Sequence, residues 1–200
     1  MTVPFQYPAT PHIRRHGPKG YADYASFRPW LRDEYTFRCV YCLRREQWIR
    51  SQGAYDIDHF FPATQHPAQE CEYDNLRYSC SICNALKSDK LVPDPLEVFV
   101  ESLVWVSHDG TLHADSADAK KLIEELGLNS EDMIEYRNTW IEVVAMAEIY
   151  NSRLHRQLMG FPKDLPELKR LRPPGGNTRP KGIPQSFFEQ RKRDELPETY

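Results

Sequence analysis

The feature that most constrains the fold of this chain is a repeated cysteine pair. Cys39 and Cys42 are separated by two residues, and Cys80 and Cys83 repeat the same spacing. Two intervening residues let the chain turn so that both thiolates of a pair point at one position, and two pairs complete a tetrahedral site. Since four thiolates leave no open coordination position, we expect a structural Zn²⁺ that joins the two pairs. The alternative is four buried cysteines without a ligand.

Composition places the chain among globular proteins with reduced thiols. It has 200 residues, of which 40% are hydrophobic, and this is enough for one main domain with a sizeable core. No signal peptide and no apolar segment long enough to span a membrane is visible. Five cysteines in such a chain indicate metal ligands or free thiols, and Cys71 has no pair. We therefore expect a cytoplasmic protein with no membrane partner.

The charge is unevenly distributed along the chain. The net charge is −3, but residues 1–55 carry nine Lys or Arg against four Asp or Glu, and residues 160–194 carry the same numbers. Residues 91–159 carry five against thirteen. Two basic ends around a central site could follow a phosphate backbone. Taken alone, however, this pattern fits ordinary solvated surfaces better.

Local patterns predict a sequence of short elements. Residues 24–42 should contain a short helix, residues 53–61 and 76–80 should be strands separated by a turn-rich loop, and residues 81–90 should form a helix entered through Ser81. Asp109-Gly110 predicts a two-residue turn in a hairpin over residues 103–114. Ser116 and Gly127 should bound the next helix.

The C-terminal half should be helical and then irregular. Apolar residues at helical spacing predict one amphipathic helix from about residue 130 to 159, which would be about 45 Å long. After residue 160 a basic segment rich in Pro and Gly should be only partly ordered. We divide the chain into a basic N-terminal arm (1–36), a core (37–92), a hairpin with a helical extension (93–160) and a basic tail (161–200). The helical extension could mediate a homodimer or bind a partner protein.

Between and beside the cysteine pairs lie polar residues that together indicate a reactive site. Asp58 and His59 lie in the first predicted strand, Asn75 precedes the second, and Asn84 follows the last cysteine of the two pairs. Individually these are ordinary turn, core or helix-end residues. Because a zinc would bring Asn84 back toward the strand that carries Asp58, a carboxylate and an amide oxygen could face one Mg²⁺ or Mn²⁺. The adjacent imidazole could act as a general base on water.

This order of residues resembles the HNH endonuclease family, whose fold is the ββα-metal finger. The resemblance covers roughly residues 37–90 and includes both cysteine pairs, Asp58-His59 and Pro62, Asn75-Leu76, and Asn84 with Lys87. It implies that His59 is the general base, that Asn75 positions the loop and the base, and that Asp58 and Asn84 hold the catalytic metal. Asn84 stands where the family has its last histidine, a variation that favours Mg²⁺ or Mn²⁺.

The resemblance implies an α+β fold in which a zinc-stapled ββα-metal finger is followed by a hairpin and a helical region with a long helix. It also implies a metal-dependent endonuclease that cuts DNA and leaves 5′-phosphate and 3′-hydroxyl ends. Lys87 could meet a substrate phosphate or could be a solvated helix lysine. From Arg44, Arg45 and Arg50 we expect no more than generic backbone contacts.

Two other functions remain open at this point. The chain could be a zinc-stabilised nucleic-acid or protein binding module without catalysis, or a metal-dependent hydrolase of another substrate. One geometric condition also applies. Neighbouring residues on a regular strand point to opposite faces, so Asp58 and His59 can share a reaction centre only if the strand ends or bends there.

Overall fold

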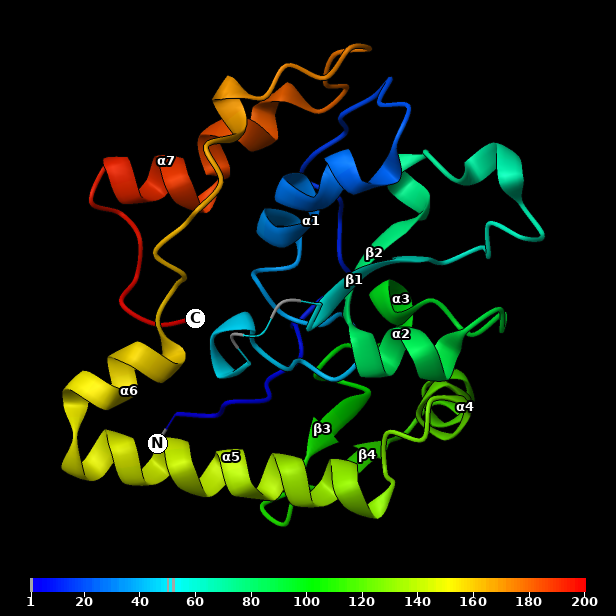
Figure 1. Cartoon of the computed structure of the whole chain (residues 1–200). Coiled ribbons are helices and arrows are strands. Elements are labelled where there is room, and N and C mark those ends of the chain that lie inside the picture. The colour runs from blue at the N-terminus through cyan, green and yellow to red at the C-terminus, as the bar shows by residue number, and fades with distance from the viewer. Residues whose placement is uncertain (1, 50, 52) are drawn as a thin grey trace.

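The computed structural model describes residues 2–49, 51 and 53–200, and its centre is a strand–strand–helix unit. Strands β1 (Tyr55–His59) and β2 (Leu76–Cys80) pair antiparallel, with Tyr55 opposite Cys80 and His59 opposite Leu76. Helix α2 (Ser81–Lys87) follows β2 directly and packs against both strands (Figure 1). The two predicted strands and the predicted helix are therefore confirmed.

Both faces of this small sheet are covered, which explains why every residue of β2 is buried. On one face the rings of Tyr55 and Tyr78 stack with centroids 5.1 Å apart. Helix α1 (Arg28–Glu34) is the short helix predicted within residues 24–42, and it contacts β2. It directly follows the 3₁₀ turn η1 (Tyr24–Phe27). Short 3₁₀ turns η2 (Glu46–Trp48), η3 (Pro67–Gln69) and η4 (Tyr73–Asn75) lie in the connections.

The next segment is a short helix α3 (Pro95–Val98), a hairpin of β3 (Val104–Val106) and β4 (Leu112–Ala114), and helix α4 (Ala117–Glu125). The hairpin is confirmed, but its loop is longer than predicted. Ser107 donates its N–H to the carbonyl of Thr111 across a three-residue loop, with Gly110 at φ 87°. Ser116 caps α4 by accepting the Ala119 N–H, and Gly127 ends it at φ 55°, as predicted.

The predicted single helix over residues 130–159 is wrong, because the chain breaks at Asn151. Helix α5 (Glu131–Tyr150) ends there, and α6 (Ser152–Met159) begins in a new direction. Asn151 has φ −151°, outside the helical region, and its side chain accepts the N–H of Leu154 as the cap of α6. A short polar side chain that bonds nearby backbone competes with helix continuation.

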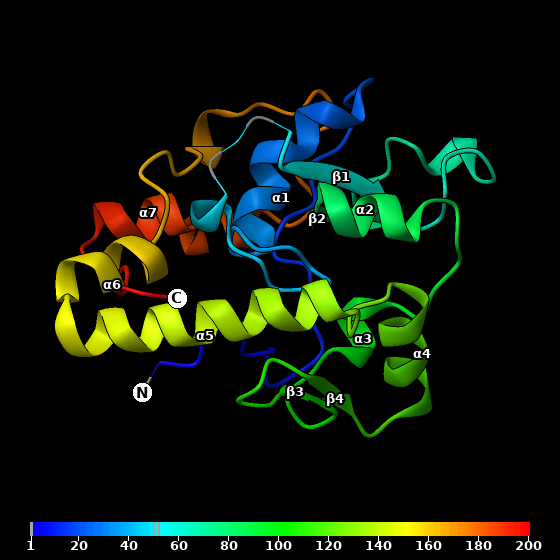
Figure 2. The ribbon, with the colours of Figure 1, turned by 60° about the horizontal axis from the view of Figure 1, so that its bottom comes forward.

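Helix α5 runs beneath the β1–β2–α2 unit, with one end near α4 and the other near α6 (Figure 2). Trp140 joins it to the turn η2 by stacking on Trp48, with ring centroids 4.4 Å apart. One hydrophobic core includes residues from Phe5 to Leu168. The amphipathic pattern is only partly used for this core, since Ile149 is 63% exposed.

The terminal segments lie against each other instead of forming free arms. Lys19 and Gly176 share a backbone hydrogen bond, Pro18 pairs with Asn177, and Leu168 is 1% exposed. The tail contains the 3₁₀ turns η5 (Leu168–Arg170) and η6 (Pro180–Gln185) and helix α7 (Phe187–Lys192), and it crosses beside α1 (Figure 1). The predicted partly ordered tail is wrong, because pairing with residues 17–20 satisfies backbone groups that the tail alone leaves open.

No helix in the described parts of the chain combines the length and apolarity that crossing a membrane requires.

Candidate metal centre and active site

The four cysteines of the two pairs converge into one buried cluster, here called the four-cysteine cluster. The ligand atoms of Cys39, Cys42, Cys80 and Cys83 all lie within 4.8 Å of one another. The Sγ atoms of Cys42 and Cys80 are 3.8 Å apart. Sulfurs at tetrahedral positions about 2.3 Å from one Zn²⁺ are separated by about 3.8 Å, so the spacing fits this ion. The cysteines are therefore positioned to bind a metal such as zinc.

Local backbone geometry builds the first half of the cluster. Arg38 and Arg45 form an antiparallel bridge, and the Cys39 N–H donates to the Arg44 carbonyl. Leu43 returns its N–H to the Cys39 carbonyl from a left-handed conformation, φ 56°. This tight turn carries Cys42 as well. The second half comes from the end of β2 and the first turn of α2, so the cluster joins residues 39–42 to the strand–strand–helix unit.

The thiols ionise unequally when no metal holds them. Hydrogen bonds from Cys39, Cys42 and Cys83 lower the pKa of Cys80, whereas burial raises the pKa of Cys39. The neighbouring thiols thus favour a thiolate at Cys80, whereas burial disfavours a second thiolate at Cys39. A divalent cation at the centre would remove that opposition, which is the condition for four thiolate ligands.

Asp58 lies at the interior side of β1 and is 3% exposed. Its carboxylate accepts the Tyr41 hydroxyl at 2.6 Å on Oδ2, and the Lys87 ammonium lies 3.0 Å from Oδ1. Burial and the charge of Asp58 raise the pKa of Tyr41 well above its usual value, so the phenol stays a donor. Lys87 is 0% exposed and also donates to the carbonyl of His59 at 2.7 Å. In this arrangement Lys87 faces neither solvent nor substrate.

His59 is the last residue of β1 and is partly exposed. Its Nε2 lies 3.0 Å from the carbonyl oxygen of Glu70, and its ring meets that of Tyr24 edge-on at 4.8 Å. A carbonyl only accepts, so Nε2 carries the proton of the neutral ring and Nδ1 keeps its lone pair. Asp58 and His59 are both paired in the ladder, opposite Arg77 and Leu76, and the strand ends at His59.

Asn75 closes the loop that holds His59. Its Oδ1 accepts the Phe61 N–H at 2.8 Å, and its Nδ2 donates to the carbonyls of Phe61 at 3.0 Å and Gln69 at 3.2 Å. Gln69 directly precedes Glu70, whose carbonyl contacts the imidazole. Asn75 therefore fixes both ends of the segment that orients His59, although it touches neither the ring nor a metal ligand.

Asn84 lies in the middle of α2 and is partly exposed. Lys87 follows it by one helical turn and reaches Asp58. Helix α2 contacts β1, and Lys87 is the residue of this helix that reaches Asp58. One carboxylate and one amide supply the oxygen donors that Mg²⁺ or Mn²⁺ takes in proteins. These donors fit such an ion, but a lysine ammonium already neutralises Asp58.

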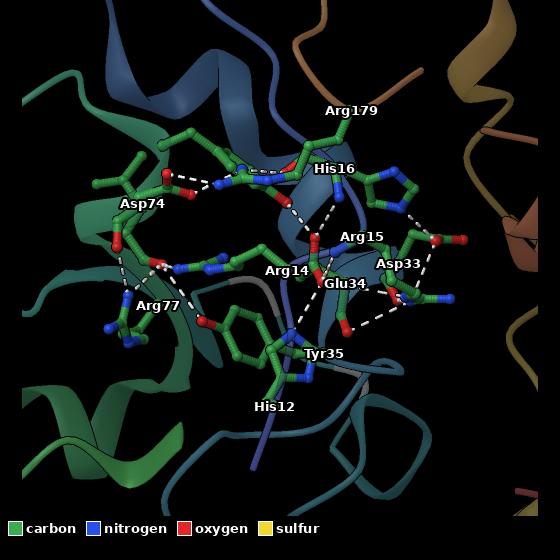
Figure 3. Close-up of polar contacts among 12 residues, drawn as sticks. His12, Arg14, Arg15, His16, Asp33, Glu34, Tyr35, Asp74, Arg77 and Arg179 are labelled. Atoms are coloured by element: carbon green, nitrogen blue, oxygen red, sulfur yellow. Dashed lines mark hydrogen bonds and ion pairs between the residues drawn. The ribbon is translucent and has the colours of Figure 1, made fainter. Parts of the chain in front are cut away.

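Several basic residues that could contact a nucleic acid serve the fold instead. His12 lies 2.8 Å from Glu34, and the guanidinium of Arg15 lies 3.3 Å from Asp33 (Figure 3). Burial favours the neutral form of Glu34, but the hydrogen bond from His12 and the charge of Arg14 outweigh it and lower the pKa of Glu34 to about 2. This part of the N-terminal segment is anchored to α1.

The same holds elsewhere in the basic regions. Arg179 of the tail pairs with Asp74 at 2.8 Å (Figure 3). Arg44 is 5% and Arg45 1% exposed, so both side chains are packed inside the protein. The guanidinium of Arg44 lies 3.9 Å from the ring centre of Tyr136, which accounts for its burial. Arg50 lies outside the described residues.

Three contributors to the site were not predicted, namely Tyr41, Tyr24 and the carbonyl of Glu70. Tyr41 lies between Cys39 and Cys42. Because the cysteine cluster brings this turn close to the strands, the hydroxyl of an aromatic residue in the turn could have been predicted to bond a polar group of a strand. Tyr24 and the carbonyl of Glu70 have no signal in the sequence, because their contact with His59 depends on how distant segments pack. A scan of protein-family models and a search of curated proteins both found no match for this chain.

Proposed function

We propose that the protein is a metal-dependent endonuclease of the HNH type that hydrolyses DNA phosphodiester bonds. The observation that carries the proposal is the orientation of His59. Its Nε2 is held by the Glu70 carbonyl, and its Nδ1 is left to accept a proton, beside a buried carboxylate on a strand that the four-cysteine cluster ties to α2. This is the arrangement that a general base acting on water needs.

Each residue of the site has a role in this function. His59 takes a proton from the attacking water through Nδ1. Asn75 keeps the 61–70 segment in place, so that the imidazole does not rotate out of line. Asp58 and Asn84 would hold one Mg²⁺ or Mn²⁺, which when bound stabilises negative charge on the phosphate and on the leaving 3′ oxygen. The products would carry 5′-phosphate and 3′-hydroxyl ends.

The four-cysteine cluster would hold Zn²⁺ with a structural role. Cys39 and Cys42 come from a turn, whereas Cys80 and Cys83 flank the junction of β2 and α2. The metal would fix the direction in which α2 leaves the sheet. Because Asn84 directly follows the last cysteine, that direction decides whether its amide faces Asp58.

One observation favours a second function, a zinc-stabilised binding module without catalysis. Lys87 neutralises Asp58 in a fully buried ion pair, and a carboxylate used in this way is not free for a divalent cation. In a binding module the pair would be permanent. The two functions differ in one respect. In the nuclease Asp58 would exchange Lys87 for a divalent cation, and in the binding module it would not.

The deciding experiment is incubation of the purified protein with plasmid and with single-stranded DNA in Mg²⁺, Mn²⁺ or EDTA. We expect cleavage by the wild type that EDTA stops and that His59→Ala abolishes. His108→Ala is the matched control, because it removes an exposed histidine of the β3–β4 loop. Equal inactivity of wild type and His59→Ala in every metal would reject the nuclease and leave the binding module.

A further inference from the structure

Lys87 occupies an unusual position for a lysine. It ends α2, is 0% exposed, and spends two of its three N–H groups on Asp58 and on the carbonyl of His59, at 3.0 Å and 2.7 Å. With the Tyr41 hydroxyl on the other carboxylate oxygen, both oxygens of Asp58 have a partner. The pair is neutral, and both partners are bonded.

Stability alone does not explain this pair. Removing two charges from water costs about as much as their attraction returns, so well-packed apolar residues would serve a purely structural purpose equally well. The pair, moreover, touches the backbone of the candidate base, because the Lys87 ammonium also donates to the His59 carbonyl, and it lies where α2 meets β1. The Lys87 ammonium occupies the position beside Oδ1 of Asp58 that a metal cation would take if Asp58 were its ligand.

The end of α2 offers Lys87 a way out. Ser88 has φ 48°, which terminates the helix, and residues 88–91 are exposed. A change confined to the last helical turn would carry the ammonium to the surface without moving Cys83 or Asn84. Once outside, the ammonium could meet a phosphate oxygen of a nucleic acid bound at this site.

We infer that Lys87 is the resident cation of Asp58 in the metal-free protein and leaves it when Mg²⁺ or Mn²⁺ binds, becoming a phosphate-contacting residue. This inference rests on the proposed function and adds to it a positioning role for Lys87. The ion pair holds the Asp58 carboxylate in one orientation while no metal is present. It also lowers the affinity for a divalent cation, because the ammonium must first be displaced.

The first test measures Mn²⁺ binding to the full chain without DNA. The readout is the electron paramagnetic resonance signal of free Mn²⁺, which falls as the ion binds. Lys87→Met should bind Mn²⁺ at least about tenfold more tightly than wild type, since a competing positive charge is gone. Lys90→Met is the matched control, because Lys90 lies three residues later and is exposed, and its affinity should equal wild type. Equal or weaker binding by Lys87→Met would overturn the inference.

A second test uses the wild-type protein and does not depend on whether the variant folds. An amine-reactive reagent is applied with and without saturating Mn²⁺, and modification of each lysine is quantified by mass spectrometry. Lys87 should be protected without metal and at least about tenfold more reactive with it, while Lys90 should react equally in both conditions. Protection of Lys87 at saturating Mn²⁺ would overturn the inference.

The two proposals fail in different ways. DNA cleavage with Mn²⁺ while Lys87 stays protected leaves the nuclease and removes only the exchange. Mn²⁺ binding that exposes Lys87 without any cleavage removes the nuclease and leaves the exchange. Absence of Mn²⁺ binding at the Asp58 site removes both.

Discussion

Replacement of Asn75 by alanine tests whether this residue orients the base through the 61–70 segment. The substitution removes three hydrogen bonds, to the N–H and carbonyl of Phe61 and to the carbonyl of Gln69. Each such bond contributes about 1 kcal/mol net, and Asn75 is 5% exposed, so water replaces the lost bonds poorly. We expect the free energy of unfolding to fall by about 3 kcal/mol.

The effect on cleavage should exceed the effect of lower stability. Without the Asn75 hydrogen bonds to Phe61 and Gln69, the carbonyl of Glu70 is no longer fixed, and this carbonyl holds Nε2 of His59 at 3.0 Å. Misplacement of a catalytic group by about 1 Å can reduce a rate about 100-fold, and we expect a loss of this order per folded molecule. Unfolding would be measured by tryptophan fluorescence in urea, and cleavage with plasmid at a temperature where the variant remains folded.

Asn129 provides a control of the same geometry. Its side chain accepts the N–H of Leu112 at 2.9 Å and donates to the same residue's carbonyl at 2.7 Å, as Asn75 does for Phe61. Asn129 is exposed, so Asn129→Ala should cost only about 1 kcal/mol and should leave cleavage unchanged. If Asn75→Ala cleaved DNA at the wild-type rate, the assigned path from Asn75 to His59 would be refuted.

Three further results are expected. Cys42→Ser should lose the bound zinc, about one equivalent per chain by atomic emission, and unfold at lower urea; retention of a full equivalent would contradict the four-cysteine site. The pKa of Glu34 is lowered from 4.5 to about 2, so its contribution of about 3 kcal/mol is complete above pH 4.5 and is lost as the pH falls toward 2. Glu34→Gln should therefore differ from wild type in urea unfolding at pH 7 but much less at pH 2.5, and a constant difference would argue against this linkage. Asn151→Ala removes the side chain that accepts the Leu154 N–H and should lower the free energy of unfolding by about 1 kcal/mol, with an unchanged value pointing to a cap supplied by water.

The sequence by itself determined the elements whose geometry depends on near neighbours. The two cysteine pairs at fixed spacing predict a shared metal site, and the structure brings their four sulfurs together. Ser116 and Gly127 bound a helix as predicted, because a cap and a left-handed residue act within one turn. The sequence also sufficed to select the candidate site residues, because Asp58, His59 and Asn75 lie between the two cysteine pairs and Asn84 directly follows the second pair.

Only the tertiary structure decided how those residues are used. The exposure of Lys87 could not be predicted, because its burial depends on Asp58, a residue 29 positions earlier in the chain. The ordering of the tail likewise follows from contacts with distant segments. A buried charge is stable only beside its partner, and which groups become partners is settled when the sheet, α2 and the two ends of the chain pack together.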